Sequence, residues 1–353
     1  MNDTKEFAYQ LGKASIAYQD ERFYTWDASV IKAEGRYHLF ASRWPYSPKL
    51  QFGWNWLFNS EIFHAVSEKP EGPYAFQNVV LSRRGRAYFD GMNTHNPCIK
   101  CFQGKYYLYY MGCTYGGPMF DEEHPLSDGY TLETWNRKRI GLAIADSIDG
   151  PFHRFDAPLL EPRDCSHWDC TITTNPTVAI LPDGTTYMIY KSRSSADAPL
   201  ALGMAVAPRP EGPFHRLTEG PLFTQEDGTP YGMEDPYLWY DEKRKRFCLI
   251  AKDDPRSGSG ITGYWGAGFY AESEDAVHFF LPKHPMVYTR DIVWEDGHRS
   301  TQGNLERPAL LFNEKGEPTH IFFASGPSST PFSYERPTYV LSFPLLPKEN
   351  RGE

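Results

Sequence analysis

Glu234-Asp235-Pro236-Tyr237-Leu238 is the clearest of five copies of one short pattern in this chain. Each copy has a polar or charged residue, usually followed by Pro, at the start of an apolar strand. The other copies are Trp26-Asp27-Ala28-Ser29-Val30-Ile31, His95-Asn96-Pro97-Cys98-Ile99, Thr174-Asn175-Pro176-Thr177-Val178 and Glu306-Arg307-Pro308-Ala309-Leu310. Equivalent positions, from Asp27 to Arg307, are 69, 79, 60 and 72 residues apart. A repeat of this length indicates a repeat architecture.

A second, aromatic-rich strand follows each copy after a tight turn such as Gln103-Gly104-Lys105 or Pro182-Asp183-Gly184. Residues in these turns tolerate positive φ, so each repeat is predicted to contain an antiparallel hairpin. Three repeats continue with a small-residue strand and a Gly-Pro-aromatic turn, which begin at Gly72, Gly150 and Gly212. Proline ends strand pairing there, and an outer strand is expected to follow.

The sequence therefore predicts an all-β fold, a five-bladed β-propeller whose blades are four-stranded antiparallel sheets. We expect a single domain over residues 1–353, with blades beginning near residues 26, 95, 174, 234 and 306 and with the termini closing the ring. A four-stranded blade needs about 40 to 50 residues, so each unit also carries long loops. Long loops on a rigid scaffold often form a site, and residues 114–140 are expected to wall the channel mouth into a pocket.

The composition of the chain indicates which classes of binding partner are favoured. The net charge of -9 argues against nucleic acid, because phosphate backbones require clustered Lys and Arg. The chain has 23 Tyr, 23 Phe and 9 Trp, and aromatic faces suit the C–H faces of sugars, so a carbohydrate partner is favoured. No apolar run approaches the roughly 18 residues that span a membrane, and residues 1–5 do not begin a signal peptide. We expect a cytoplasmic protein, or a periplasmic or secreted one if a leader was removed; the oligomeric state is not indicated.

Innermost strands of a propeller run beside its axis, so their starts converge at one end of the channel. This convergence brings together the carboxyl groups of Asp27, Glu234, Asp235 and Glu306. Glycoside hydrolysis needs two carboxyl groups, one ionised and one protonated, and crowding of like charges raises the pKa of one of them. The sequence predicts catalysis by these four residues, with Asp27 and Glu234 as the main pair.

From about Trp26 to Phe323 the layout resembles the five-bladed β-propeller glycoside hydrolases of family 43 and their relatives. The resemblance implies that Asp27, in Trp-Asp-Ala-Ser, is the general base and that Glu234, in Met-Glu-Asp-Pro, is the general acid. It also implies hydrolysis with inversion. The pocket expected from the long loops favours release of a terminal sugar.

Two positions depart from the family pattern. Ala28 replaces the usual Pro after the base. Asn175 stands where the family has a third carboxylate, and an amide cannot supply its charge. Either Asp235, Asp169 or Glu306 supplies that charge, or the chemistry differs. The chain is therefore placed in the wider fold group and not in family 43 proper.

Candidate substrate-binding residues lie at the blade starts and on nearby loops; they are Asn96, Asn175, Arg307, His95, His167, Trp168, Trp54 and Trp265. Each has a structural alternative. Asp27 and its equivalents could cap turns, Glu306 could pair with Arg307, and a loop histidine is as often structural as functional.

Two other functions stay open. A carbohydrate-binding propeller without catalysis is compatible with Asn175, and a phosphorylase or lyase relative is compatible with Arg307, the one basic residue placed to begin a phosphate pocket. No metal or cofactor is predicted, because the oxygen-rich loop spacing of a calcium site is absent from the sequence, although related propellers can hold a channel calcium ion.

Overall fold

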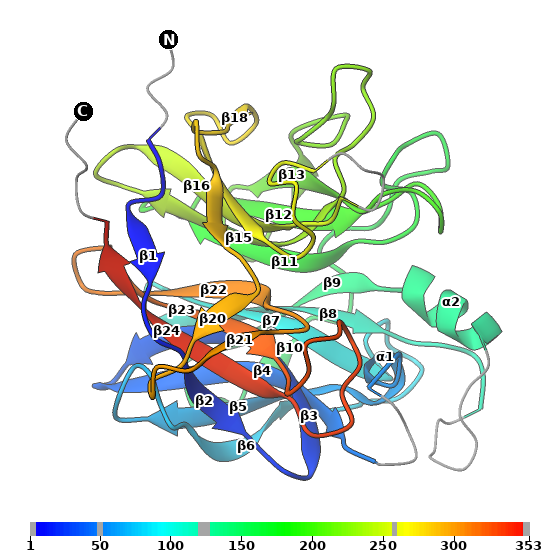
Figure 1. Ribbon diagram of the computed structural model, residues 1–353. Helices are drawn as coiled ribbons and strands as arrows, with labels where there is room; N and C mark the ends of the chain where they lie inside the picture. Colours follow the sequence, from blue (N-terminus) through cyan, green and yellow to red (C-terminus); the bar gives the residue numbers. More distant parts are fainter. Residues whose placement is uncertain (1–4, 48–51, 119–127, 256–259, 349–353) are drawn as a thin grey trace.

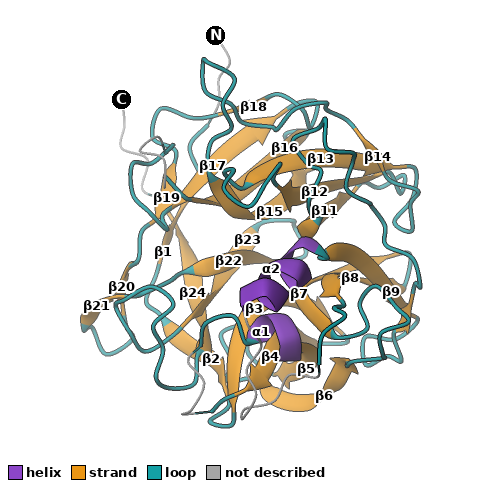
Figure 2. Ribbon diagram, turned by 90° about the vertical axis from the view of Figure 1, so that its right-hand side faces the viewer, coloured by secondary structure: helices purple, strands orange, loops and turns teal. Residues whose placement is uncertain are grey.

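Five antiparallel sheets surround a central channel in the computed structural model, which describes residues 5–47, 52–118, 128–255 and 260–348 (Figure 1). The predicted all-β, five-bladed β-propeller is confirmed. Figure 2 looks along the channel, with the two short helices α1 (Trp56–Asn59) and α2 (Asp128–Asn136) lying over its centre. Neither described helix has the length and apolar character needed to cross a membrane.

The first three blades follow chain order. Their strands are β3 (Phe23–Ala33), β4 (Arg36–Pro45), β5 (Glu61–Ser67) and β6 (Ala75–Leu81) in blade one; β7 (Asn93–Phe102), β8 (Lys105–Cys113), β9 (Arg139–Ala145) and β10 (His153–Arg154) in blade two; β11 (Thr174–Ile180), β12 (Thr186–Ser192), β13 (Ala201–Ala207) and β14 (His215–Arg216) in blade three. The predicted Gly-Pro-aromatic turns each join the third strand of a blade to the fourth, and buried apolar residues such as Phe40 and Leu108 pack between neighbouring blades.

The last two blades are more elaborate. Blade four contains β15 (Met233–Asp241), β16 (Arg246–Asp253), β17 (Gly268–Ser273) and β18 (Phe279–Phe280), and β19 (Met286–Tyr288) also pairs with β17. A separate hairpin, β20 (Asp291–Val293) and β21 (Arg299–Thr301), precedes blade five. Blade five contains β22 (Glu306–Phe312), β23 (Pro318–Ser325) and β24 (Tyr339–Pro347), and the N-terminal strands β1 (Tyr9–Leu11) and β2 (Ser15–Gln19) pair with β24. Both ends of the chain therefore build one blade, with β1 in blue beside β24 in red (Figure 1).

Each repeated blade start forms a β-bulge. Asp27, Asn96, Asn175, Asp235 and Arg307 have φ of 63°, 54°, 50°, 56° and 57°, and the strand register shifts at each of them. Asn and Asp adopt this left-handed conformation more readily than other residues with a side chain, which explains four of the five positions. Arg307 adopts it at a cost of about 1–2 kcal/mol, so other interactions must hold it there.

Asp169 supports the sheet of blade three through a buried hydrogen-bond network. Its carboxylate accepts hydrogen bonds from Tyr190 Oη at 2.8 Å, Arg163 Nε at 2.7 Å and Arg216 Nε at 2.5 Å. The same arrangement recurs in blade two with Asp90, Tyr110, Arg84 and Arg154. Because its oxygens are used in this repeated network, Asp169 does not supply the charge that Asn175 lacks.

Candidate active site

A cavity of about 870 Å³ lies at the helix-covered end of the channel, and side chains from all five blades line it. The described part of the loop over residues 114–140 contributes α2, which places Thr131, Leu132 and Trp135 on the cavity wall. Residues 119–127 of that loop lie outside the described part. Of the sequence-predicted site residues, those that line the cavity are Trp54, His95, Asn96, Asn175, Glu234, Asp235, Glu306 and Arg307.

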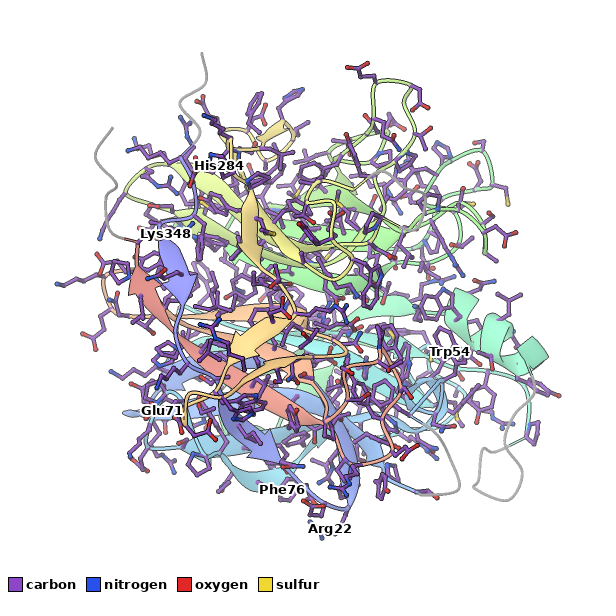
Figure 3. The ribbon with its side chains drawn as sticks, viewed as in Figure 1. Arg22, Trp54, Glu71, Phe76, His284 and Lys348 are labelled. Atoms are coloured by element: carbon purple, nitrogen blue, oxygen red, sulfur yellow. The ribbon has the colours of Figure 1, made fainter. Side chains whose placement is uncertain are left out.

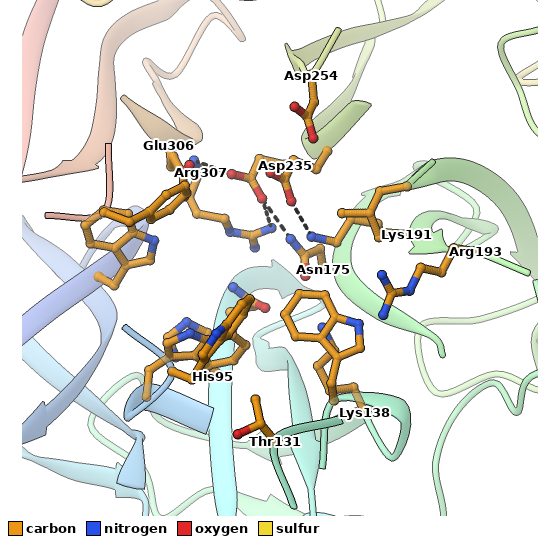
Figure 4. Close-up of a pocket in the computed structure, with 18 of the residues that line it drawn as sticks. His95, Thr131, Lys138, Asn175, Lys191, Arg193, Asp235, Asp254, Glu306 and Arg307 are labelled. Carbon is orange, nitrogen blue, oxygen red and sulfur yellow. Dashed lines mark hydrogen bonds and ion pairs between the residues drawn. The ribbon is translucent and has the colours of Figure 1, made fainter. Parts of the chain in front are cut away.

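The five bulge residues form a ring at the base of the cavity, linked by hydrogen bonds and ion pairs in the order Asn96, Asp27, Arg307, Asp235 and Asn175. Asn96 Nδ2 donates to Asp27 at 2.8 Å, and Asn175 Nδ2 donates to Asp235 at 2.8 Å. Arg307 joins the two halves: its Nε lies 3.0 Å from Asp27 Oδ1, and its Nη1 lies 3.5 Å from Asp235 Oδ1 (Figure 4). One guanidinium thus compensates two buried carboxylates, which explains why an Arg occupies a left-handed position.

Asp27 is enclosed within this ring. Its oxygens contact Ser42 Oγ at 2.6 Å, the Asn96 backbone nitrogen at 3.0 Å and Arg307 Nε at 3.0 Å, and its side chain is 1% exposed. Burial alone would raise the pKa of Asp27, but His95 and Arg307 and the hydrogen bonds from Ser42 and Asn96 lower it. Asp27 is ionised, as a base requires, yet it is not among the residues that line the cavity.

The residues immediately before the bulges form the layer that faces the cavity. In four blades these are Trp26, His95, Glu234 and Glu306. The bulge turns the following side chain into the ring and leaves the preceding one directed toward the cavity. In blades two, four and five the second residue of the pair also lines the cavity, as Asp235 does after Glu234.

Glu234 is held as a carboxylate by two lysines. Its Oε2 lies 2.7 Å from Lys191 Nζ and its Oε1 lies 2.7 Å from Lys252 Nζ. Burial would raise the pKa of Glu234, but Lys191 and Lys252 hold it well below its usual range. An ionised carboxylate cannot donate a proton, so this environment disfavours the general-acid role expected for Glu234 from the sequence.

Glu306 has the opposite protonation behaviour. Burial raises its pKa to about 7; Lys252 opposes the shift, and the neighbouring charges of Asp235 and Glu234 add to it. Its Oε1 accepts hydrogen bonds from Lys252 Nζ at 2.5 Å and Asn304 Nδ2 at 2.8 Å. Among the described residues Oε2 has no hydrogen-bond partner, so it can hold the proton. Glu306 thus meets the requirements of a general acid at neutral pH.

His95 is a neutral wall residue. Burial lowers its pKa to about 4, although Asp27 opposes the shift. Its Nδ1 lies 2.7 Å from Ser60 Oγ, its Nε2 lies 3.4 Å from Asp27, and its ring stacks on Trp56 with centroids 4.6 Å apart. Both nitrogens have partners within the protein, so His95 is placed to support Asp27 and the wall.

Indole rings form the side of the cavity beneath the helices. Trp54 is 53% exposed (Figure 3). It meets the Trp135 ring edge-on, with centroids 5.3 Å apart. Trp56 and Trp44 line the same cavity, and Phe332 lies on the side of blade five. Such faces bind the apolar faces of sugar rings. Of these rings, the sequence predicted Trp54 as a sugar contact.

Three cationic residues, Lys138, Lys191 and Arg193, also line the cavity and were not predicted. Lys138 follows α2 and its side chain is buried, 1% exposed, with Nζ 3.0 Å from the centre of the Trp135 ring. Burial and the neighbouring charges of Lys191 and Arg193 lower the pKa of Lys138 well below its usual range. In Figure 4 the three side chains lie on the right-hand side of the cavity.

Other candidates lie outside the cavity lining. His167 is on an exposed loop beside Asp164, and Trp168 stacks on Tyr190 within blade three. Trp265 donates from Nε1 to Asp254 at 2.8 Å, and Asp254 itself lines the cavity, so Trp265 acts behind the wall.

A group of possible metal ligands, His38, His64 and Asp149, lies away from this site. His38 Nδ1 and His64 Nε2 are 2.9 Å apart, and neither residue lines the cavity. Burial lowers the pKa of His64 to about 4, which favours a neutral hydrogen-bonded pair. Within the described residues, the cavity contains no cluster of metal ligands.

The fold places the chain among the five-bladed propellers. No protein-family model and no curated sequence matches it. Among solved structures, it is similar to Zg3597, a family 117 glycoside hydrolase of Zobellia galactanivorans, with 17% identity, a TM-score of 0.65 and coverage of 96% of this chain and 90% of that one.

Two further solved structures are also similar to this chain in fold and share little sequence with it. The endo-arabinase from Bacteroides thetaiotaomicron has 10% identity and a TM-score of 0.59, covering 96% of this chain and 100% of that one. A family 43 enzyme from Xanthomonas citri has 15% identity and a TM-score of 0.57, covering 94% and 91%. The resemblance to family 43 and its relatives is confirmed for the fold, and the low identity agrees with a chain outside family 43 proper.

Proposed function

We propose that this protein is a glycoside hydrolase that removes a terminal sugar from a carbohydrate. The main supporting observation is the pair Glu234 and Glu306, two cavity carboxyl groups with pKa values shifted in opposite directions and joined by Lys252. One ionised and one protonated carboxyl group at neutral pH is the combination that glycosidic cleavage requires. The fold of known glycoside hydrolases agrees with this proposal.

In the proposed reaction Glu306 donates its proton to the glycosidic oxygen as the bond from C1 to that oxygen breaks. The leaving group departs as a neutral alcohol, and the electron pair of the broken bond stays on its oxygen. Glu234 attacks C1 through its carboxylate. Water then cleaves the glycosyl ester, giving its proton to Glu306 and its hydroxyl to C1, which restores both residues.

The spacing of the pair supports this order of events. Both Oε1 atoms contact Lys252 Nζ, at 2.7 and 2.5 Å, so they lie closer than the roughly 6.5–9.5 Å that leaves room for water in an inverting enzyme. The pair therefore favours retention, in place of the inversion expected from the Asp27 and Glu234 assignment. Asp27 keeps a structural role in the ring.

The shape of the site supports action at a chain end. Helix α2 and the indole side chains cover one side of the cavity, and the bulge ring forms its base. A site closed at its base accommodates the end of a carbohydrate chain better than its interior.

A panel of nitrophenyl glycosides tests this proposal, using the native protein and the variants Glu306→Gln and Glu234→Gln. Each variant is expected to lower kcat by about 10²-fold or more, since positioned acid–base groups contribute that much. Glu272→Gln is the matched control, because Glu272 is also buried but bonds to Tyr270 and Arg244 outside the cavity. Equal turnover by native protein and both cavity variants would refute the assignment, and sugar binding without product would instead support the binding-protein alternative.

A further inference from the structure

Lys138 is a buried lysine in the cavity wall. Its side chain is 1% exposed, and it lies among the residues that line the cavity. Within the described part of the chain no carboxylate pairs with it, and its close contact is the face of Trp135. Burying an unpaired charge is costly, so a buried lysine without a counterion is uncommon.

Its neighbours increase the positive potential. Lys191 lies in β12, and Arg193 directly follows that strand. Both would repel a positive charge on Lys138. Lys191 is paired with Glu234. Arg193 donates from Nη1 to the Ala196 carbonyl at 2.6 Å, and its guanidinium lies 5.3 Å from the centre of the same Trp135 ring. The whole chain has a net charge of -9, so this local excess of positive charge does not follow from the composition.

Buried cations beside an open cavity fit an anionic group of a ligand. A bound oxyanion would supply the missing counterion for Lys138 and accept charge-assisted hydrogen bonds, which are the strong ones. The planar guanidinium of Arg193 suits carboxylate, sulfate and phosphate geometry. The Trp135 face beside these cations would contact the apolar face of a sugar.

We propose that Lys138, Lys191 and Arg193 form an oxyanion subsite for an acidic sugar, one with a carboxylate or sulfate group, at the residue cleaved by the enzyme. This inference rests on the proposed function for its sugar component. Because Lys191 contacts both this subsite and Glu234, the anionic group belongs to the sugar whose C1 faces Glu234.

Isothermal titration calorimetry tests the subsite without requiring turnover. The probes are D-glucuronate, D-galacturonate and D-galactose 6-sulfate, each compared with its neutral parent sugar and with inorganic phosphate. At least one acidic sugar is expected to bind about tenfold or more tightly than its parent, because hydrogen bonds to charged groups contribute more than neutral ones. This preference is expected to weaken as the salt concentration rises.

Two variants and one control test whether the preference for an acidic sugar depends on this subsite. Lys138→Met removes the charge and retains side-chain length, and Arg193→Met does the same at a half-buried position that tolerates substitution more readily. Both are expected to abolish the preference for the acidic sugar and to leave binding of the neutral sugar unchanged. Lys100→Met is the control, because Lys100 also lies over an aromatic ring, that of Tyr237 at 5.0 Å, but does not line the cavity.

The outcomes separate the subsite from the reaction. Lysine-dependent binding of an acidic sugar supports the subsite even where the glycoside panel gives no product, a result that counts against hydrolysis alone. Lysine-dependent binding of phosphate without any acidic sugar would overturn the acidic-sugar assignment and favour a phosphorylase. Equal affinities for acidic and neutral sugars, or equal losses for both in Lys138→Met and Arg193→Met, would overturn the subsite.

Discussion

Neighbouring residues at each blade start have separate roles. Asp235 and Arg307 have a left-handed backbone and bond to each other in the ring, and they line the cavity together with the preceding residues Glu234 and Glu306. The ring buries two carboxylates against one guanidinium, and the cavity layer holds the carboxyl groups of unequal pKa. The repeated bulge residues thus have a structural role, and in the proposed reaction the catalytic carboxyl groups stand one residue earlier.

Replacing Arg307 by Asn separates backbone strain from charge. Asn relieves the left-handed strain but leaves Asp27 and Asp235 buried without a cation, which is expected to lower the free energy of unfolding by about 3–5 kcal/mol. Urea denaturation measures this change. Lys245→Asn is the control, since Lys245 has a φ of 53° on an exposed turn, and it should be neutral or slightly stabilising. Equal stability of native protein and Arg307→Asn would contradict the ring's role.

The pKa of Glu306 predicts the pH dependence of catalysis. Its raised value of about 7 means that Glu306 is protonated below that pH and loses its proton above it, so kcat should fall as pH rises through about 7. A pH–rate profile between pH 5 and 9 measures this basic limb. Glu306→Gln should remove the limb and should lose more activity on alkyl glycosides than on nitrophenyl glycosides, whose leaving group needs less protonation. If kcat of this variant still falls as the pH rises through about 7, the titrating group is a residue other than Glu306.

At the scale of elements, α2 and the residue that follows it complete the site. Lys138 Nζ lies 3.0 Å from the centre of the Trp135 ring on this helix, and the same ring contacts Trp54. The helix therefore supplies an aromatic face to the cavity and packs against the Lys138 side chain. The residues of α1 and α2 over the channel belong to loops and not to the repeated strands. Substrate preference is therefore separable from the blade framework.

Trp135→Ala should raise KM about tenfold with a smaller change in kcat, because stacking on an indole contributes binding more than bond cleavage. Steady-state kinetics on the best nitrophenyl glycoside measures both constants. Phe76→Ala is the control, since Phe76 is 40% exposed on the outer strand β6. A fall in kcat with unchanged KM would place Trp135 in the chemical step.

Sequence reasoning reached the blade framework and missed much of the cavity, for physical reasons. The period of Asp and Asn at blade starts and the Gly-Pro turns could be read directly as hairpins and outer strands. The β-bulge at each blade start could not be read from the sequence. The sequence therefore predicts Asp27 as a cavity residue, although Asp27 does not line the cavity. Lys191 and Lys252 had a signal, because each ends an apolar second strand where an exposed lysine is not expected. Lys138 lies after a loop helix, where no repeat indicates its direction.

For the whole molecule, the N-terminal strands connect blade five to blade one. Strand β2 pairs with β24, Tyr18 packs on Phe63 with ring centroids 4.7 Å apart, and the Ala17 carbonyl accepts a hydrogen bond from the Tyr74 backbone. Removing residues 1–20 would break these contacts and expose an edge of β24. We expect lower stability across the whole ring.

Urea unfolding of this truncated protein should show a single transition at a lower midpoint, because the blades share interfaces. The control is removal of residues 1–6 alone, which leaves the buried Phe7 and both strands in place; the midpoint of this variant should stay close to that of the native protein. An unchanged midpoint after removal of residues 1–20 would mean that ring closure contributes little.

The anomeric configuration of the sugar first released, followed by NMR, tests the central assignment of Glu234 and Glu306 most directly. Retention is predicted, because their Oε1 atoms share one lysine nitrogen and leave too little room for an attacking water. Inversion would contradict this pair and return the base role to Asp27. Asp27→Asn should still release the sugar with retention in this assay, whereas Glu234→Gln should slow release by about 10²-fold or more.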